Sequence, residues 1–259
     1  MRKNYWWITC AVLLLSISII SWKSDKKTST AASSSSRNLF ENYVDELYQA
    51  ANLSASGLDE AVFQKAVTGF INLKADNMIS PFSSILTVID YNRPSHEKRM
   101  WIVDMVNETL LLNTWVAHGQ GSGVDTANTF SNTDNSHQSS LGFYLTDDIY
   151  FGKHGRSLHL DGLDEGFNSS ARQREIVVHA ADYVSQSFID QNGRIGRSWG
   201  CPAVAPEVAS TVIDDIKGKT VIYINGNDAS YTSKYLDEDL CANYVFPSEM
   251  SGRAMAAKF

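Results

Sequence analysis

Cysteine is scarce in this chain, with 3 residues among 259, and no two of them form a Cys-x-x-Cys pair. So low a count excludes a scaffold built on disulfides and a zinc site of the paired-cysteine type. Basic charge is also in short supply, because 22 lysines and arginines face 29 aspartates and glutamates, without a long basic run. The formal net charge of -7 therefore argues against nucleic acid binding, which needs clustered cations to neutralise phosphates.

Metal ligation has little support in the histidine pattern. The sequence holds 6 histidines, and none pairs with another at the spacing that places two ligands on one helix face. A His-Glu-x-x-His motif, the usual helical signature of catalytic zinc, is missing as well. We therefore expect neither a metal ion nor a cofactor.

The N-terminus has the pattern of an export signal. Arg2 and Lys3 precede an apolar stretch over residues 5–22, and lysines follow it. The length of this stretch lies between those of a signal-peptide core and a membrane span, so cleavage and anchoring both stay open. We predict that residues 1–23 form a signal peptide or membrane anchor, that the protein is exported, and that it contacts a membrane only through this segment, if the segment stays uncleaved.

Two helices are predicted after a flexible linker. Residues 24–37 are mostly Lys, Ser, Thr and Ala, a composition typical of linkers. Apolar residues then recur at three- and four-residue spacing on both sides of Asp59, which marks a helix start. This pattern predicts a helical hairpin within residues 38–78.

Strand signals dominate the rest of the chain, and we place one domain at residues 79–228. One helix interrupts the strands, beginning at Pro206 and stopping at Gly218. A Gly/Ser/Asn/Thr segment spans residues 119–140, and loops of this length are typically functional lids or disordered. Residues 229–259 show no clear pattern and are interpreted as a tail. The predicted strands lie at residues 85–89, 100–106, 109–116, 142–146, 149–152, 157–161 and 220–224.

One cysteine lies on a turn bounded by glycine and proline. Gly200 lets a substrate carbonyl approach the backbone closely, and Pro202 fixes the backbone directly after Cys201. Because Pro202 has no N–H, backbone donors to an oxyanion near the sulfur must come from residues 199–201. Such a turn suits a nucleophile.

Two arginines flank this turn. Positive charge favours the reactive thiolate, so Arg194 and Arg197 would lower the pKa of the thiol if either lies near it. A disulfide from Cys201 to Cys241 would silence the nucleophile, and the sequence leaves that pairing open. The third cysteine, Cys10, lies in the apolar N-terminal stretch.

A candidate general base lies upstream of the thiol. His179 ends the apolar run 176–178, which is typical of a buried strand, and a histidine where a strand meets a loop can act as a base near neutral pH. Asp182 could orient its ring, as a third group often does, or it could be an ordinary aspartate at a helix start. For Cys201 and His179 together, the alternative is a structural cysteine and a core histidine.

His179 and the run Ser198-Trp199-Gly200-Cys201 resemble the active-site signature of YkuD-type L,D-transpeptidases. The similarity is closer to one branch, the murein L,D-transpeptidase catalytic domain family, and it covers about residues 80–225. Several blocks in one order are far more specific than any single block. These blocks are Asp90–Ser95, Val116–Gly119, Phe130–Thr133, Ser136–Tyr144, Tyr150–Gly155 and Leu160–Asp164.

Two departures from the general signature concern spacing and proton transfer. The spacer between the histidine and the serine, residues 180–197, is longer than in the signature, and Trp199 stands where most relatives have a histidine. An indole offers one N–H donor, no acceptor and no titratable proton. The resemblance therefore leaves the acid and base role to His179 alone.

The resemblance implies a fold, a reaction and a location. The fold would be mainly β, a β-rich sandwich of the L,D-transpeptidase/YkuD type with a few helices and the N-terminal helical hairpin. The protein would act as an L,D-transpeptidase on peptidoglycan stem peptides, in the periplasm or cell envelope, through a thioester at Cys201. An L,D-carboxypeptidase that uses the same two residues and a non-enzymatic wall-binding module stay as alternatives.

The resemblance also implies roles for individual residues. Cys201 would be the nucleophile and His179 the base. Ser198, Trp199 and Gly200 would support the turn or hold the oxyanion. The residues expected to line the substrate groove are His154, Gly155, His159 and Arg197, although ordinary surface histidines fit the first and third equally well.

Overall fold

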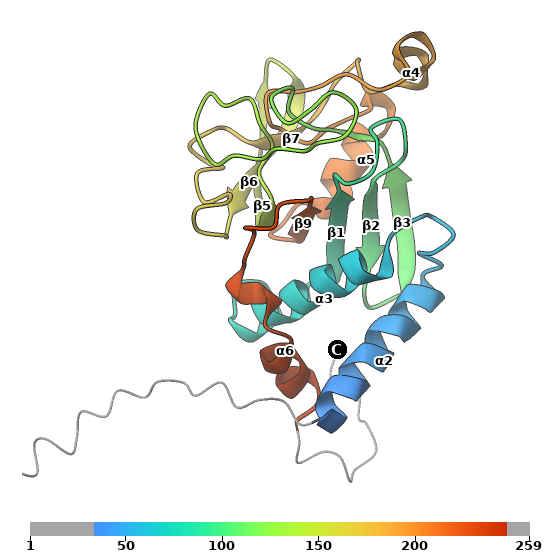
Figure 1. Cartoon of the computed structure of the whole chain (residues 1–259), viewed down its shortest axis with the longest axis vertical. Helices are drawn as coiled ribbons and strands as arrows, with labels where there is room; N and C mark the ends of the chain where they lie inside the picture. Colours follow the sequence, from blue (N-terminus) through green and yellow to red (C-terminus); the bar gives the residue numbers. More distant parts are fainter. Residues whose placement is uncertain (1–33, 248–259) are drawn as a thin grey trace, which may run out of the picture. The chain divides into compact units, whose positions relative to one another are not determined.

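Two helices, α2 (Ser34–Ala50) and α3 (Glu60–Ala75), open the described part of the chain (Figure 1). The structure is a computed structural model that describes residues 34–247. The segment predicted as a signal peptide or anchor, residues 1–23, lies outside that range. Within the range, every helix is too short or too polar to cross a membrane.

The helical hairpin predicted within residues 38–78 is confirmed. Asp59 caps α3, because its carboxylate accepts a backbone N–H of the first helical turn at 3.1 Å. α2 begins at Ser34, so the end of the predicted linker is helical, which corrects its boundary. Ser36 is buried and its hydroxyl donates to the Phe246 carbonyl at 2.7 Å, a tertiary contact that outweighs the linker-like composition.

The described strands join in one mixed sheet, which confirms the mainly β fold. They are β1 (Ile85–Asp90), β2 (Met100–Asp104), β3 (Thr109–Thr114), β4 (Val116–Ala117), β5 (Gly142–Gly152), β6 (Gly155–Gly162), β7 (Val177–Ala180), β8 (Ala203–Val204) and β9 (Val221–Asn225). Their order is β3-β2-β1-β9-β5-β6-β7-β8-β4, with β1 parallel to β9 and β7 parallel to β8. The two strands predicted at 142–146 and 149–152 are one, β5, whose register to β6 shifts between Thr146 and Ile149.

The sheet curls until the ends of its two edge strands meet. β3 and β4 stand at opposite ends of the strand order, yet Trp115 alone separates them along the chain. Two steps of extended chain span at most ~7 Å, so these strand ends lie next to each other. The sheet therefore wraps around its own core, in agreement with the expected β-rich sandwich.

Helices cover both faces of the sheet. α5 (Pro206–Ile216), which confirms the helix predicted from Pro206, packs into one apolar cluster together with Ile222 of β9. α2, α3 and the C-terminal helix α6 (Glu238–Val245) pack into a second cluster together with Tyr223 of β9 (Figure 1). Consecutive strand residues point to opposite faces, so Ile222 and Tyr223 divide between the two clusters.

The tail interpreted as patternless, residues 229–259, has defined structure up to residue 247. It contains a 3-10 turn, η1 (Lys234–Leu236), and α6, which packs against α2 and α3. Asn72 of α3 holds this segment, because its amide donates to the carbonyls of Tyr235 and Asp237 at 2.8 and 2.9 Å. The pattern analysis missed α6 because two helical turns offer too few residues to establish a periodicity.

Candidate active site

Parallel pairing of two strands brings the two candidate residues together. His179 of β7 lies opposite Ala203 of β8, and Cys201 precedes Ala203 by two residues. The backbone N–H of Val177 is hydrogen-bonded to the Cys201 sulfur, which also lies 3.6 Å from the carbonyl oxygen of Glu175. The sheet register therefore places the thiol alongside β7, on the turn that leads into β8.

The His179 ring is held by the backbone next to it. Nδ1 lies 2.8 Å from the Ala180 carbonyl oxygen, which can only accept, so Nδ1 carries the proton and Nε2 is the basic nitrogen. Burial lowers the pKa of His179, and the nearby His154 and Lys153 further oppose its protonation. The ring is therefore neutral near pH 7, as a general base must be.

Neither interpretation of Asp182 made from the sequence holds. The Ala180 carbonyl orients the His179 ring in its place. The neighbouring helix, α4 (Gln186–Asn192), begins several residues later, and its cap is Ser185, whose hydroxyl accepts a backbone N–H at 3.3 Å.

Two serine hydroxyls fix the turn that carries the thiol. Ser198 Oγ accepts the Gly200 N–H at 3.1 Å and donates to the Cys201 carbonyl at 2.6 Å. Ser139 Oγ donates to the Gly200 carbonyl at 3.2 Å. Gly200 has a φ of 124°, and a Cβ there would lie 2.7 Å from the Gln138 carbonyl oxygen. Only glycine fits this position without strain.

These hydrogen bonds narrow the set of possible oxyanion donors. The Gly200 N–H is taken by Ser198 Oγ, so Gly200 shapes the turn instead of donating from it. Among residues 199–201, the N–H groups of Trp199 and Cys201 are the remaining candidates. Ser198 binds both sides of the thiol turn, and its role in support of the reaction stays a prediction.

Trp199 forms an exposed wall beside the thiol turn, with 65% of the residue accessible. Its ring stacks on His137, with centroids 4.7 Å apart and planes 9° apart. Lys153, on the two-residue turn between β5 and β6, has its Nζ 5.5 Å from the Trp199 ring centroid. His154, the other residue of that turn, stacks on His179 at 4.3 Å between centroids. The tip of the β5–β6 hairpin therefore overhangs the site.

The positive charges near the thiol come from other residues than the two predicted. Burial raises the pKa of the Cys201 thiol, and Arg174 and Lys153 counteract part of that rise. Arg197 and Arg194 instead donate to backbone carbonyls, at 2.9 and 2.8 Å. Arg197, expected in the substrate groove, thus anchors a loop.

The polar segment 119–140 is an ordered wall of the site, so the disordered alternative is wrong. Gly119 forms a parallel bridge with Ser198, and His137 covers the Trp199 ring. Arg174 donates hydrogen bonds to four residues of this segment. The sequence around Arg174 gave no indication of these contacts, because the acceptors are distant along the chain. The acceptors are the carbonyls of Ser131 and Gln138, at 2.7 and 2.6 Å, and the hydroxyls of Ser140 and Ser136, at 2.6 and 3.3 Å.

A buried arginine supports the turn from behind. Arg99 is fully buried and donates to the Val116 carbonyl at 3.0 Å and to His118 Nδ1 at 2.7 Å. Burial and this cation lower the pKa of His118 to about 3, so His118 is neutral and its Nδ1 lone pair is occupied. The His118 carbonyl accepts the Ser198 N–H at 2.9 Å. His118 therefore has a structural role and does not replace the histidine that Trp199 displaces.

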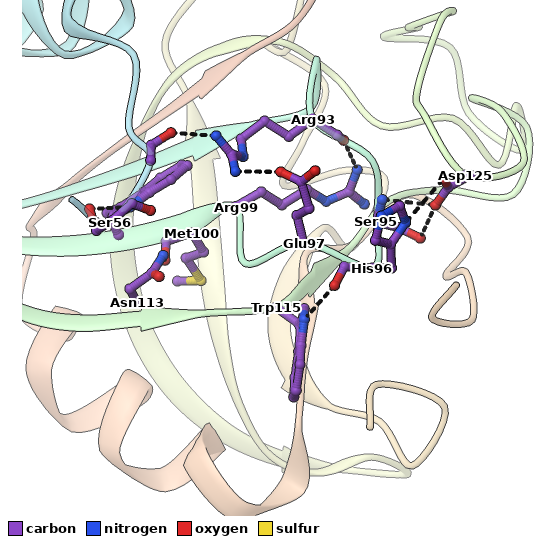
Figure 2. A network of polar contacts seen from close by, with 12 residues as sticks. Ser56, Arg93, Ser95, His96, Glu97, Arg99, Met100, Asn113, Trp115 and Asp125 are labelled. Carbon is purple, nitrogen blue, oxygen red and sulfur yellow. Dashed lines mark hydrogen bonds and ion pairs between the residues drawn. The ribbon is translucent and has the colours of Figure 1, made fainter. Parts of the chain in front are cut away.

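Figure 2 shows how the loop before β2 connects the surroundings of Arg99 to the helical hairpin and to the wall 119–140. Arg93 donates to the Glu97 carboxylate and to the Gly57 carbonyl in the connection between α2 and α3. The hydroxyl and the N–H of Ser95 both donate to one oxygen of Asp125, at 2.8 and 2.9 Å. The wall 119–140 is thus tied to the helical hairpin through this loop.

Two residues expected in the groove have other contacts. His159 Nδ1 lies 3.2 Å from an Asp148 carboxylate oxygen, and its ring stacks on Tyr150 with 4.3 Å between centroids. Gly155 pairs with Gly152 and has a φ of 73°, which allows the two-residue turn. Only His154 of the predicted hairpin residues contacts the candidate base.

Both cysteines in the described range are free thiols, so the pairing that would silence the nucleophile does not form. Cys241 lies in α6 and is fully buried. Across the same range, His, Cys, Asp and Glu side chains form no group of three or more that could hold a metal ion.

A protein-family model described as "L,D-transpeptidase catalytic domain" matches residues 54–225. Among solved structures, an L,D-transpeptidase from Mycobacterium smegmatis is 13% identical with a TM-score of 0.34, and the alignment covers 55% of this chain and 59% of that one. L,D-transpeptidase 1 from Mycobacterium tuberculosis is 11% identical with a TM-score of 0.31, and the alignment covers 55% of this chain and 62% of that one. The helical cell shape determining protein Pgp2 from Campylobacter jejuni is 10% identical with a TM-score of 0.38, and the alignment covers 62% of this chain and 54% of that one. Among curated proteins, no sequence matches this chain.

This chain spans less than two thirds of the length of each of these three structures, and at these TM-scores the family assignment rests on the family model. The matched range is more than half of the chain. It contains every described strand, the oriented His179 ring and the Cys201 turn. The chain therefore belongs to the L,D-transpeptidase catalytic domain family, whose members act on peptidoglycan.

Proposed function

We propose that the protein is a cysteine-dependent L,D-transpeptidase that acts on peptidoglycan stem peptides through a thioester at Cys201. The orientation of His179 carries this proposal, since its Nδ1 proton is held by the Ala180 carbonyl while Nε2 is left to accept a proton beside the thiol turn. Such a substrate implies work in the cell envelope, reached by export through residues 1–23.

Acylation is the first step. His179 Nε2 accepts the thiol proton as Sγ of Cys201 attacks the carbonyl carbon at the L-centre of the third stem residue. A C–S bond forms, and the N–H groups of Trp199 and Cys201 bind the oxyanion. When the intermediate collapses, the peptide C–N bond breaks and His179 returns its proton to the amine of the leaving D-amino acid.

Transfer to the acceptor is the second step. An amine of a second stem attacks the thioester carbon and gives a proton to His179 Nε2. The C–S bond then breaks, the sulfur of Cys201 takes a proton back from His179, and a new amide joins the two stems. Water in place of the amine would release a tripeptide, which is the carboxypeptidase reaction.

The electrostatics favour a neutral resting pair. Burial raises the pKa of Cys201 and lowers that of His179, so the thiol and the imidazole are both uncharged near neutral pH. Proton transfer then accompanies the attack, and the pair titrates as one unit. The Val177 N–H and the Arg174 guanidinium stabilise the negative sulfur that forms.

Mass spectrometry of purified stem tetrapeptides incubated with the protein tests the proposal. We expect crosslinked dimers together with the free D-amino acid. Tripeptides alone would replace the transpeptidase by a carboxypeptidase. Unchanged tetrapeptides, with a folded protein, would overturn the proposal in favour of a wall-binding module.

A further inference from the structure

The β5–β6 hairpin presents a lysine at the mouth of the site. Lys153 is one of two residues in a turn closed by the pairing of Gly152 with Gly155, so the backbone on both sides is fixed by the sheet. His179 pairs with Ser157 on the same hairpin, which sets the turn close to the candidate base. The Lys153 side chain is exposed and its ammonium lies 5.5 Å from the Trp199 ring centroid.

The other cations around the thiol turn already have protein partners. Arg174 donates to four oxygens of the wall 119–140, and Arg197 and Arg194 donate to backbone carbonyls. Within residues 34–247, Lys153 has no carboxylate within ion-pair distance, and its recorded contact is the ring face of Trp199. An ammonium has three donors and no acceptor, so Lys153 is the cation of this site that is available to an anion.

We propose that Lys153 is the specificity-determining residue of the donor site and binds the free carboxylate of the terminal D-amino acid, the residue that leaves on acylation. This inference rests on the proposed function and names which stem the site accepts.

The chemistry of the donor stem matches this position. The terminal carboxylate is separated from the scissile C–N bond by a single carbon, so it must lie near Cys201 during the attack. Lys153 is close enough to lower the pKa of both Cys201 and His179. Trp199 supplies a flat apolar surface that restricts the aliphatic side chain of Lys153, and His137 in turn stacks on the Trp199 ring.

A cation at this place selects stems by length. A stem that ends one residue after the scissile bond places its carboxylate at Lys153. A longer or amidated stem leaves the ammonium without a counter-charge, and desolvation of an unpaired charge is unfavourable. The site would therefore prefer tetrapeptide donors with a free terminus.

The experiment compares kcat/KM for a stem tetrapeptide with kcat/KM for its C-terminal amide. The ratio of these two values is the readout, because a charge change near the thiol affects both substrates and cancels. We expect the parental protein to prefer the free acid and Lys153→Met to lower the ratio about tenfold, the size typical of a charge-assisted contact. Lys153→Arg should keep the preference.

A second lysine provides the matched control. Lys98 is also exposed and places its Nζ 5.9 Å from a tryptophan ring, that of Trp115. Lys98→Met should leave the ratio at the parental value. The inference would be overturned if the parental protein cleaves the acid and the amide equally well. It would also be overturned if Lys153→Met leaves the ratio at the parental value. If the parental protein cleaves neither substrate, the proposed function itself fails.

Discussion

The two thiols of the described range have opposite surroundings. Burial raises the pKa of both. Around Cys201, the Val177 N–H and the cations Arg174 and Lys153 counteract that rise. Cys241 is fully buried in α6, and the acidic residues at the start of that helix raise the pKa of its thiol further.

The difference lies in the surroundings of each thiol and not in the thiol itself. Cys201 lies on a turn that Ser198 and Ser139 hold and that Gly200 fits without strain, and the neighbouring strand carries an oriented imidazole. Cys241 fills an apolar cluster between helices, where a cysteine behaves as a small hydrophobic side chain. Four experiments can break this contrast.

The largest expected effect comes from exchanging each thiol in turn. Cys201→Ala should abolish release of the terminal D-amino acid, since no other group on the turn can form the thioester. Cys241→Ala should keep turnover within about twofold while lowering the melting temperature, because it leaves a small cavity. Amino acid release and thermal unfolding are the measurements. Parental turnover by the Cys201→Ala protein would refute the mechanism.

Removal of the base should have the next largest effect. His179→Ala should lower kcat/KM by about 10²–10⁴-fold, the usual contribution of a general base. His96→Ala is the control, because His96 is exposed and its recorded partner is Asp125. Steady-state kinetics with the tetrapeptide decide the matter, and a His179→Ala protein as active as the control would assign the base elsewhere.

The need for glycine in the thiol turn can be tested by comparing two glycines. Gly200→Ala places a Cβ 2.7 Å from the Gln138 carbonyl oxygen at a φ of 124°. Gly193 ends α4 at a φ of 71° and has open space around the missing Cβ. Gly193→Ala should cost about 1 kcal/mol of unfolding free energy, and Gly200→Ala should cost more and also lower activity. Equal stabilities in chemical denaturation would show that the turn tolerates a side chain.

The smallest effect is a difference in pH dependence. Burial disfavours the thiolate and raises the pKa of Cys201, so iodoacetamide labelling should rise about tenfold per pH unit until the pH passes that value. Cys241 is inaccessible as well as harder to ionise, and it should remain unlabelled until the protein unfolds. Peptide mass mapping after labelling separates the sites. Labelling of Cys201 that stays level from pH 6 to 9 would contradict the neutral resting pair.

Local patterns carried much of the prediction. The helical spacing around Asp59, the apolar strand before His179 and the Gly200-Cys201-Pro202 turn are all properties of neighbouring residues. The helix and the turn lie where the sequence placed them, while β7 extends through His179 to Ala180. The sequence did not predict the short helix α6, because this helix packs against α2 and α3 and its own eight residues do not reveal that packing.

By itself, the sequence determined the chemistry of the candidate site, namely a thiol beside a glycine and a histidine at a strand end. Only the tertiary structure decided which groups serve that chemistry. Ala180 replaced Asp182 as the orienting partner, Arg174 and Lys153 replaced the two flanking arginines, and Gly200 lost its N–H to a serine. The Ala180 and Ser198 contacts are local, and the folded backbone decides which of several nearby groups makes them. The position of Lys153 beside the site depends instead on the register of β6 and β7, which joins residues that are distant along the chain.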